Sequence, residues 1–245
     1  MQKLYQKNKL TFALLWIAVY VIGSSLADAA SKALGIEKLL TFPLLLAMCG
    51  TLGAWLRKER LCAEYGLRRP GLPARRFLYY LPLVLIVSCN LWFGVRMNLP
   101  PVETFLYIGS MLCVGFLEEL IFRGLLFKAL LKDGVRTAII VSSVTFGIGH
   151  IVNLVNGSGA ELIPNLCQVC YAIAFGFLCV MIFLRSGSLL PCILAHSVVN
   201  ALSVFSNEAA SSAAADILVS VILCVVGAAY ALYIAKTIPE TERAS

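Results

Sequence analysis

Charged residues are scarce in this 245-residue chain. Asp, Glu, Lys and Arg together make up 13% of it, about half of their share in soluble domains, while 60% of the residues are hydrophobic. No polar stretch is long enough to form a soluble domain, so the composition predicts one membrane domain over residues 1–245. A cleavable signal peptide is not expected, because the apolar segment after MQKLYQKNKL is long and has no clear small-residue cleavage site.

A cysteine framework and a zinc-protease motif are also missing. The nine cysteines are scattered, mostly in apolar runs, where cysteine behaves as a small hydrophobic residue. Cys167 and Cys170 have CxxC spacing, but neither a thioredoxin-like βαβ pattern nor a second ligand pair accompanies them, which favours simple packing on a helix face. HExxH does not occur.

Apolar runs of about 20 residues predict transmembrane helices. We therefore expect an all-α, polytopic helical bundle of about eight spans. They lie near residues 10–27, 39–56, 77–95, 104–122, 137–155, 166–184, 188–205 and 216–235. The fourth keeps its helical periodicity to about Leu131.

The distribution of basic residues predicts the orientation. With the N-terminus inside, 17 of the 20 Lys and Arg residues fall in inner segments, and only Lys32, Lys38 and Arg96 fall in outer ones. Because basic residues are enriched in cytoplasmic segments, we expect both termini in the cytoplasm. A basic face against anionic lipid accounts for the net charge of +7 without any nucleic-acid partner.

A few costly polar residues stand inside these apolar runs. Glu118, Glu119 and Arg123 lie in VGFLEELIFRGLLF, His150 ends SSVTFGIGH, and His196 and Asn200 lie in SLLPCILAHSVVN. An ionisable group within a span costs about 2.5–3.5 kcal/mol, which makes each one a functional-site hypothesis. Glu119 and Arg123 are four positions apart, so we expect them to pair on one helix face.

Helical rise predicts the depth of these residues. Glu118 and His150 are each sixteen positions from Gly134, in the turn between their spans, so both lie roughly 24 Å along the helices. His196 comes about nine positions after its inner loop, so the same helical rise places it about 10 Å less deep than Glu118 and His150. Helix tilt or a deeper helix start must close that gap.

Two acids, two histidines and an amide on three helices form a hydrolytic set, with a base for water and donors for an oxyanion. Phe146 by itself indicates packing. A small transporter or proton-coupled carrier would use similar residues, although no inverted repeat is found between the halves of the chain.

Three ordered motifs carry a family resemblance. EELIFRG fits EExxxR, FGIGH fits FxxxH and HSVVN fits HxxxN, and together they resemble the CPBP family, the CAAX-protease and bacteriocin-processing (Abi) proteins, over residues 105–205. The resemblance implies an intramembrane endopeptidase, with a cavity open to the cytoplasm, in the plasma membrane of a bacterium. Its partners would be membrane lipid and a peptide or lipidated-protein substrate. A catalytically silent immunity or scaffold member of the family is the alternative.

The resemblance also implies roles for the residues. Glu118 would activate water with help from His150, while His196 and Asn200 would stabilise the oxyanion. Glu119, Arg123 and Phe146 would support them. A divalent metal such as Zn²⁺ is an open alternative, with Glu118, His150 and His196 as candidate ligands, although the zincin spacing is absent.

Overall fold

Helices, mostly apolar, make up most of residues 1–156 and 161–239, the parts of the chain that this computed structural model describes, and no strand is found there. The predicted all-α class is confirmed. The elements are α1 (Gln2–Lys7), α2 (Lys9–Ala33), α3 (Thr41–Lys58), η1 (Ala74–Tyr80), α4 (Leu81–Val87), η2 (Ser88–Leu91), α5 (Pro101–Glu118), η3 (Glu119–Leu126), α6 (Phe127–Leu130), η4 (Leu131–Asp133), α7 (Val135–Gly149), η5 (His150–Leu154), α8 (Leu162–Ser186), α9 (Leu190–Leu202), η6 (Ser203–Phe205), η7 (Glu208–Ala210) and α10 (Ala213–Thr237).

Within the described residues, five helical segments are long and apolar enough to cross a membrane: Lys9–Ala33, Pro101–Asp133, Val135–Leu154, Leu162–Ser186 and Ala213–Thr237. The helix expected to continue past residue 122 does so, through η3, α6 and η4 to Asp133. Leu190–Phe205 is shorter. The total of eight spans remains a prediction.

The single helix expected over residues 77–95 is wrong. The segment is broken into η1, the seven-residue α4 and η2. Leu78, Tyr79 and Tyr80 have positive φ, and the regular helix begins only at Leu81, with Pro82 in its first turn. The hydroxyl of Tyr230 donates to the Phe77 carbonyl, and the Phe77 ring stacks on Tyr80. Mean hydropathy does not reveal such a break, because it averages over the composition of the segment.

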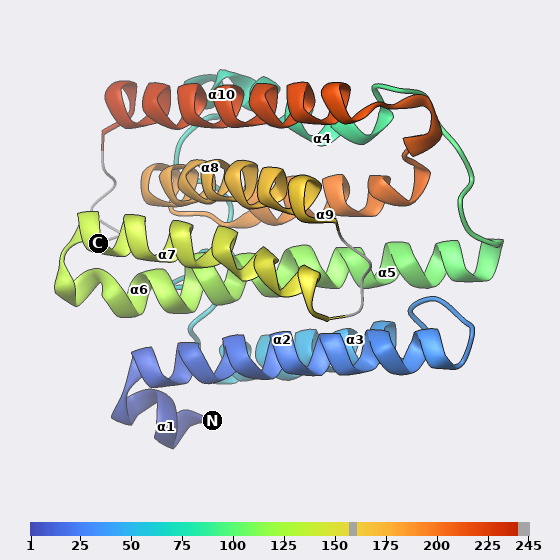
Figure 1. Cartoon of the computed structure of the whole chain (residues 1–245). Helices are drawn as coiled ribbons and strands as arrows, with labels where there is room; N and C mark the ends of the chain where they lie inside the picture. Colours follow the sequence, from blue (N-terminus) through green and yellow to red (C-terminus); the bar gives the residue numbers. More distant parts are fainter. Residues whose placement is uncertain (157–160, 240–245) are drawn as a thin grey trace.

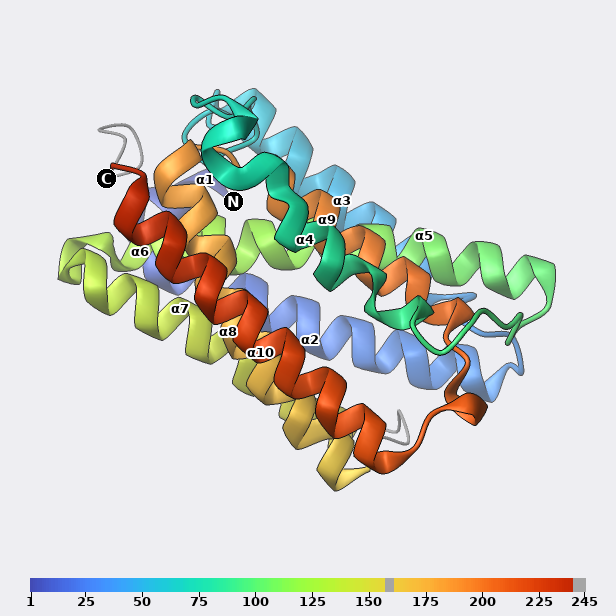
Figure 2. The ribbon, with the colours of Figure 1, turned by 90° about the horizontal axis from the view of Figure 1, so that it is seen from above.

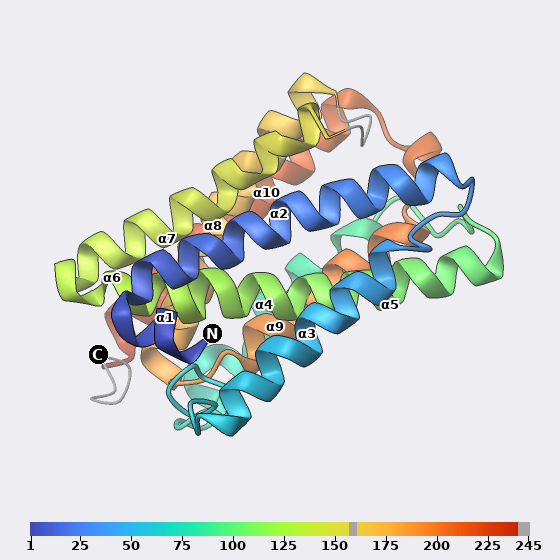
Figure 3. The same cartoon turned by 90° about the horizontal axis from the view of Figure 1, so that it is seen from below.

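The helices form layers (Figure 1). α10 and α4 lie at the top of that view, α8 and α9 beneath them, then α5 to α7, and α2 with α3 at the bottom. Seen from above, α4 lies beside α9 and α10 (Figure 2). Seen from below, α5 lies between α2 and α3, and it packs on α3 (Figure 3). All eight residues of η3 are buried, which puts this segment at the centre of the bundle.

The bundle has two distinct ends. At the first, which we call the basic end, the connection 59–73 meets the α8–α9 turn, where Gly71 N donates to Ser186 O and Leu189 N donates to Gly66 O. α1 and the end of α10 lie there too (Figure 1). At the opposite or far end, Glu37 N donates to Glu103, and the Asn98 amide donates to the Val204 carbonyl.

Candidate active site

The junction of α5 and η3 meets α9 at the middle of the bundle. His196 Nδ1 lies 2.8 Å from Glu119 Oε1, and His196 Nε2 lies 3.5 Å from Glu118 Oε2. The depth gap expected for His196 is therefore closed. The α8–α9 turn is held inside the bundle, because the 59–73 connection packs across it at Gly66 and Leu189, so α9 starts deeper than the turn near Gly134.

Glu119 and Arg123 form the expected ion pair. Arg123 Nη1 lies 3.2 Å from Glu119 Oε1, and both side chains are 0% exposed. They lie on η3, where the chain is in a π-helical turn, a feature frequent at functional sites. A buried pair of this kind holds its helix in one arrangement, since removing either partner leaves a buried charge uncompensated.

Phe146 does more than fill space. Its ring lies 3.7 Å from the Arg123 guanidinium carbon, and it meets the rings of His150 and His196 edge-on at 5.2 and 5.6 Å. Stacking on the guanidinium face stabilises a buried cation. The ring of Phe175 in α8 also meets the His196 ring edge-on, with 5.4 Å between the ring centroids. Sequence reasoning missed Phe175, because it lies outside the three motifs and in an ordinary apolar run.

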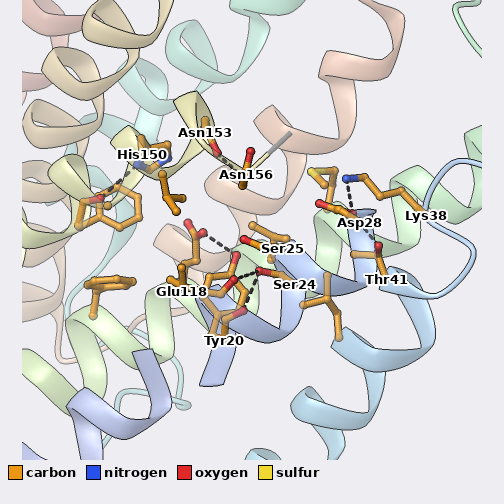
Figure 4. A pocket seen from close by; sticks show the side chains of 18 residues that line it. Tyr20, Ser24, Ser25, Asp28, Lys38, Thr41, Glu118, His150, Asn153 and Asn156 are labelled. Atoms are coloured by element: carbon orange, nitrogen blue, oxygen red, sulfur yellow. Dashed lines mark hydrogen bonds and ion pairs between the residues drawn. The ribbon is translucent and has the colours of Figure 1, made fainter. Parts of the chain in front are cut away.

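Tyr20 of α2 is a second residue that the sequence reasoning missed. Its hydroxyl donates to Glu118 Oε1 at 2.6 Å (Figure 4). This bond leaves Glu118 Oε2 turned toward His196. A signal was available, since Tyr20, Ser24 and Asp28 form a polar stripe at four-residue spacing within a predicted span.

His150 stands where α7 passes into η5. Its Nδ1 lies 3.2 Å from the Phe146 carbonyl, and its own carbonyl accepts a hydrogen bond from the Asn165 amide of α8 at 2.9 Å. These contacts fix the start of η5 against α8. The unbroken helix expected through residue 155 therefore changes to a tighter 3-10 turn at His150.

One cavity joins the predicted catalytic residues. Glu118, His150, His196 and Asn200 all line a space of about 440 Å³. An adjoining space of about 140 Å³ shares Glu118 and His150 and reaches Tyr20 (Figure 4). The arrangement offers a carboxylate, two imidazoles and an amide around a volume that a peptide segment can fill, which is the equipment for acyl-bond hydrolysis.

The candidate metal ligands do not converge. Among the described residues, the only three metal-ligating side chains with donor atoms within 4.8 Å of one another are Glu119, Cys179 and Cys192. Glu118, His150 and His196 do not form such a group. The Arg123 guanidinium beside Glu119 adds a positive charge that repels a cation from the cysteine group.

Comparison with known families identifies one segment. Residues 100–202 match the family model described as Rce1-like, type II CAAX prenyl endopeptidase. Searches of curated proteins and of solved structures found no match. The matched segment holds Glu118, Glu119, Arg123, Phe146, His150, His196 and Asn200, but not Tyr20. The family supports a membrane protease function over a carrier. Residues 100–202 thus match an Rce1-like CAAX endopeptidase domain, in agreement with the CPBP resemblance of the three motifs.

Proposed function

We propose that the chain is an intramembrane endopeptidase that hydrolyses a peptide bond with water activated by Glu118. The observation that carries the proposal is that the two adjacent carboxylates have different surroundings. Glu119 is fully buried and bound to Arg123 and His196, whereas Glu118 lines the cavity and keeps Oε2 directed toward His196. One carboxylate is structural and the other is available for chemistry.

Glu118 is the general base. Its Oε2 takes a proton from a water molecule in the cavity, and the water oxygen attacks the carbonyl carbon of the scissile peptide. His150 lines the same cavity and orients that water. When the tetrahedral intermediate collapses, the C–N bond breaks and the leaving amine takes the proton back from Glu118. The base thereby returns to its starting state.

His196 and Asn200 stabilise the oxyanion. Glu119 can only accept, so His196 Nδ1 donates to it, and this contact leaves Nε2 facing Glu118 in the cavity. Asn200 lies one helical turn further along α9 and lines the same cavity, so its amide can reach the same oxygen. Losing one such donor costs about 2.7–4 kcal/mol of transition-state stabilisation.

The substitution Glu118→Gln tests the proposal. It removes the base and keeps the shape, so cleavage of fluorogenic peptides in detergent, both lipidated and unlipidated, should fall about 10²–10⁴-fold while the protein still inserts and folds. Glu103→Gln is the matched control, since it makes the same change in the first turn of α5, at the far end of the bundle, and should retain activity. Undiminished cleavage by Glu118→Gln would remove Glu118 as the base.

A further inference from the structure

The cavity does not extend equally toward the two ends of the bundle. On each helix its lining residues run from the middle of the helix toward the far end. On α2 they run from Tyr20 to Asp28, and on α8 from Phe175 back to Gln168. Lys38, in the connection between α2 and α3, lines the cavity at the far end (Figure 4).

Toward the basic end the described residues around the site are closely packed. In that direction, beyond Glu118 and His196, lie several large apolar residues that are at most 1% exposed: Leu56, Tyr65, Leu120, Phe127, Phe183 and Leu189. The Tyr65 hydroxyl also donates to Tyr5 of α1, which ties the N-terminal segment into this layer. A close-packed apolar layer leaves no path for water or a peptide.

The charges identify the two sides of the membrane. Sixteen of the seventeen Lys and Arg residues assigned to inner segments lie in the described part of the chain, and nearly all of these lie at or near the basic end. Lys32, Lys38 and Arg96 are at the far end. The positive-inside rule then makes the basic end cytoplasmic and the far end non-cytoplasmic.

The chemistry of the passage also suits a peptide. Between the site and the far end it is lined by Asn90, Asn153, Asn156 and Gln168, which carry side-chain amides. Amides both donate and accept, so they can satisfy the N–H and C=O groups of an extended backbone inside a membrane. At the mouth, Lys38 pairs with Asp28 at 2.8 Å and with Glu37 at 3.6 Å.

We propose that the substrate reaches Glu118 from the non-cytoplasmic side, so that the enzyme cuts a peptide exposed there. Such a substrate is a translocated peptide or the outward end of a membrane-inserted one, and not the lipidated C-terminus of a cytosolic protein. That the bound peptide is a substrate rests on the proposed function, whereas the route follows from the shape of the cavity. It departs from the cytoplasmic opening that the family resemblance implies.

Thiol labelling tests the route without requiring turnover. Ser25 lines the cavity, whereas Ile22 on the same helix is 60% exposed on the outer surface of the bundle, where lipid covers it. Ser25→Cys, Ile22→Cys and Arg76→Cys are each treated with a charged, membrane-impermeant thiol reagent in right-side-out and in inverted vesicles. Peptide mass spectrometry reads each position separately, so the native cysteines stay in place.

We expect Ser25→Cys to be labelled in right-side-out vesicles and Arg76→Cys only in inverted ones. Ile22→Cys and the fully buried native Cys179 should be labelled in neither. Labelling of Ser25→Cys from the same side as Arg76→Cys, or from neither side, would overturn the route, and so would labelling of Arg76→Cys from outside. Because no cleavage is measured, the route can fail while Glu118→Gln still abolishes activity, and the reverse also holds.

Discussion

Glu118 and Glu119 are adjacent residues of a continuous helix, and their side chains point about 100° apart. This angle sends Glu119 toward Arg123 and His196, and Glu118 toward Tyr20 and the cavity. Two carboxylates within a membrane would each be expensive alone. A fixed cation for one and a polar cavity for the other reduce that cost.

Replacing Glu119 should lower the stability of the protein as well as its activity. Glu119→Gln leaves Arg123 buried beside a neutral amide, and breaking a buried pair costs about 3–5 kcal/mol. We expect a clearly lower melting temperature in detergent, together with reduced cleavage. Glu118→Gln serves as the comparison, since Glu118 has no buried cation to strand and should melt near the wild-type temperature. Equal melting of the two variants would contradict the division of labour between the acids.

Tyr20 acts as a positioning residue through Glu118. Tyr20→Phe removes one hydrogen bond to a carboxylate, which is worth about 1.5–3 kcal/mol, and kcat should fall about 10–100-fold. KM should stay near the wild-type value, because the ring and its packing remain. Tyr79→Phe is the matched control, since Tyr79 is 68% exposed and remote from the site. A fall in stability equal to the fall in rate would point to a packing role instead.

Between elements, the site depends on how closely α5 and α9 approach. A Cβ at Gly115 would lie 2.3 Å from Ser197 Oγ and 2.5 Å from Ser197 N, so only glycine fits there. Small residues at helix crossings allow such contact in membrane proteins. Ser197 is next to His196, and Gly115 is one turn before Glu118 and Glu119. The close crossing therefore sets the distance between the imidazole and the carboxylates.

Gly115→Ala should widen this crossing. The methyl group meets backbone atoms, so α9 must move, and overpacking of this kind costs about 1–3 kcal/mol. We expect most of the cleavage activity to be lost, because catalytic groups tolerate little displacement. Gly50→Ala in α3 is the control: no heavy atom lies within 4 Å of its added Cβ, and a helical Gly→Ala change stabilises by up to about 1 kcal/mol. Wild-type turnover in Gly115→Ala would show that the crossing distance is not critical.

At the scale of the whole molecule, the sequence predicted what depends on local pattern. The long helices, the continuation of α5 to Asp133 and the Glu119–Arg123 pair follow from hydropathy and helical spacing, which are properties of single segments. The break at residues 78–80, the depth of His196 and the contact from Tyr20 to Glu118 were not predicted. Each depends on packing between segments far apart in sequence, such as Gly66 against Leu189, and no local pattern encodes that packing.

The orientation of the whole bundle is the remaining prediction at this scale. α1 and the end of α10 lie at the same end of the molecule, which requires an even number of crossings, and the broken segment from η1 to η2 must count as one for the total to be eight. With the basic end in the cytoplasm, reporters fused before Met1 and after Ser245 should both be reached only from inside. A tag inserted at Gly35 in the α2–α3 connection should be reached only from outside. A C-terminal reporter accessible from outside intact cells, with the N-terminal one protected, would mean an odd number of crossings and would exclude the segment around α4 as a span.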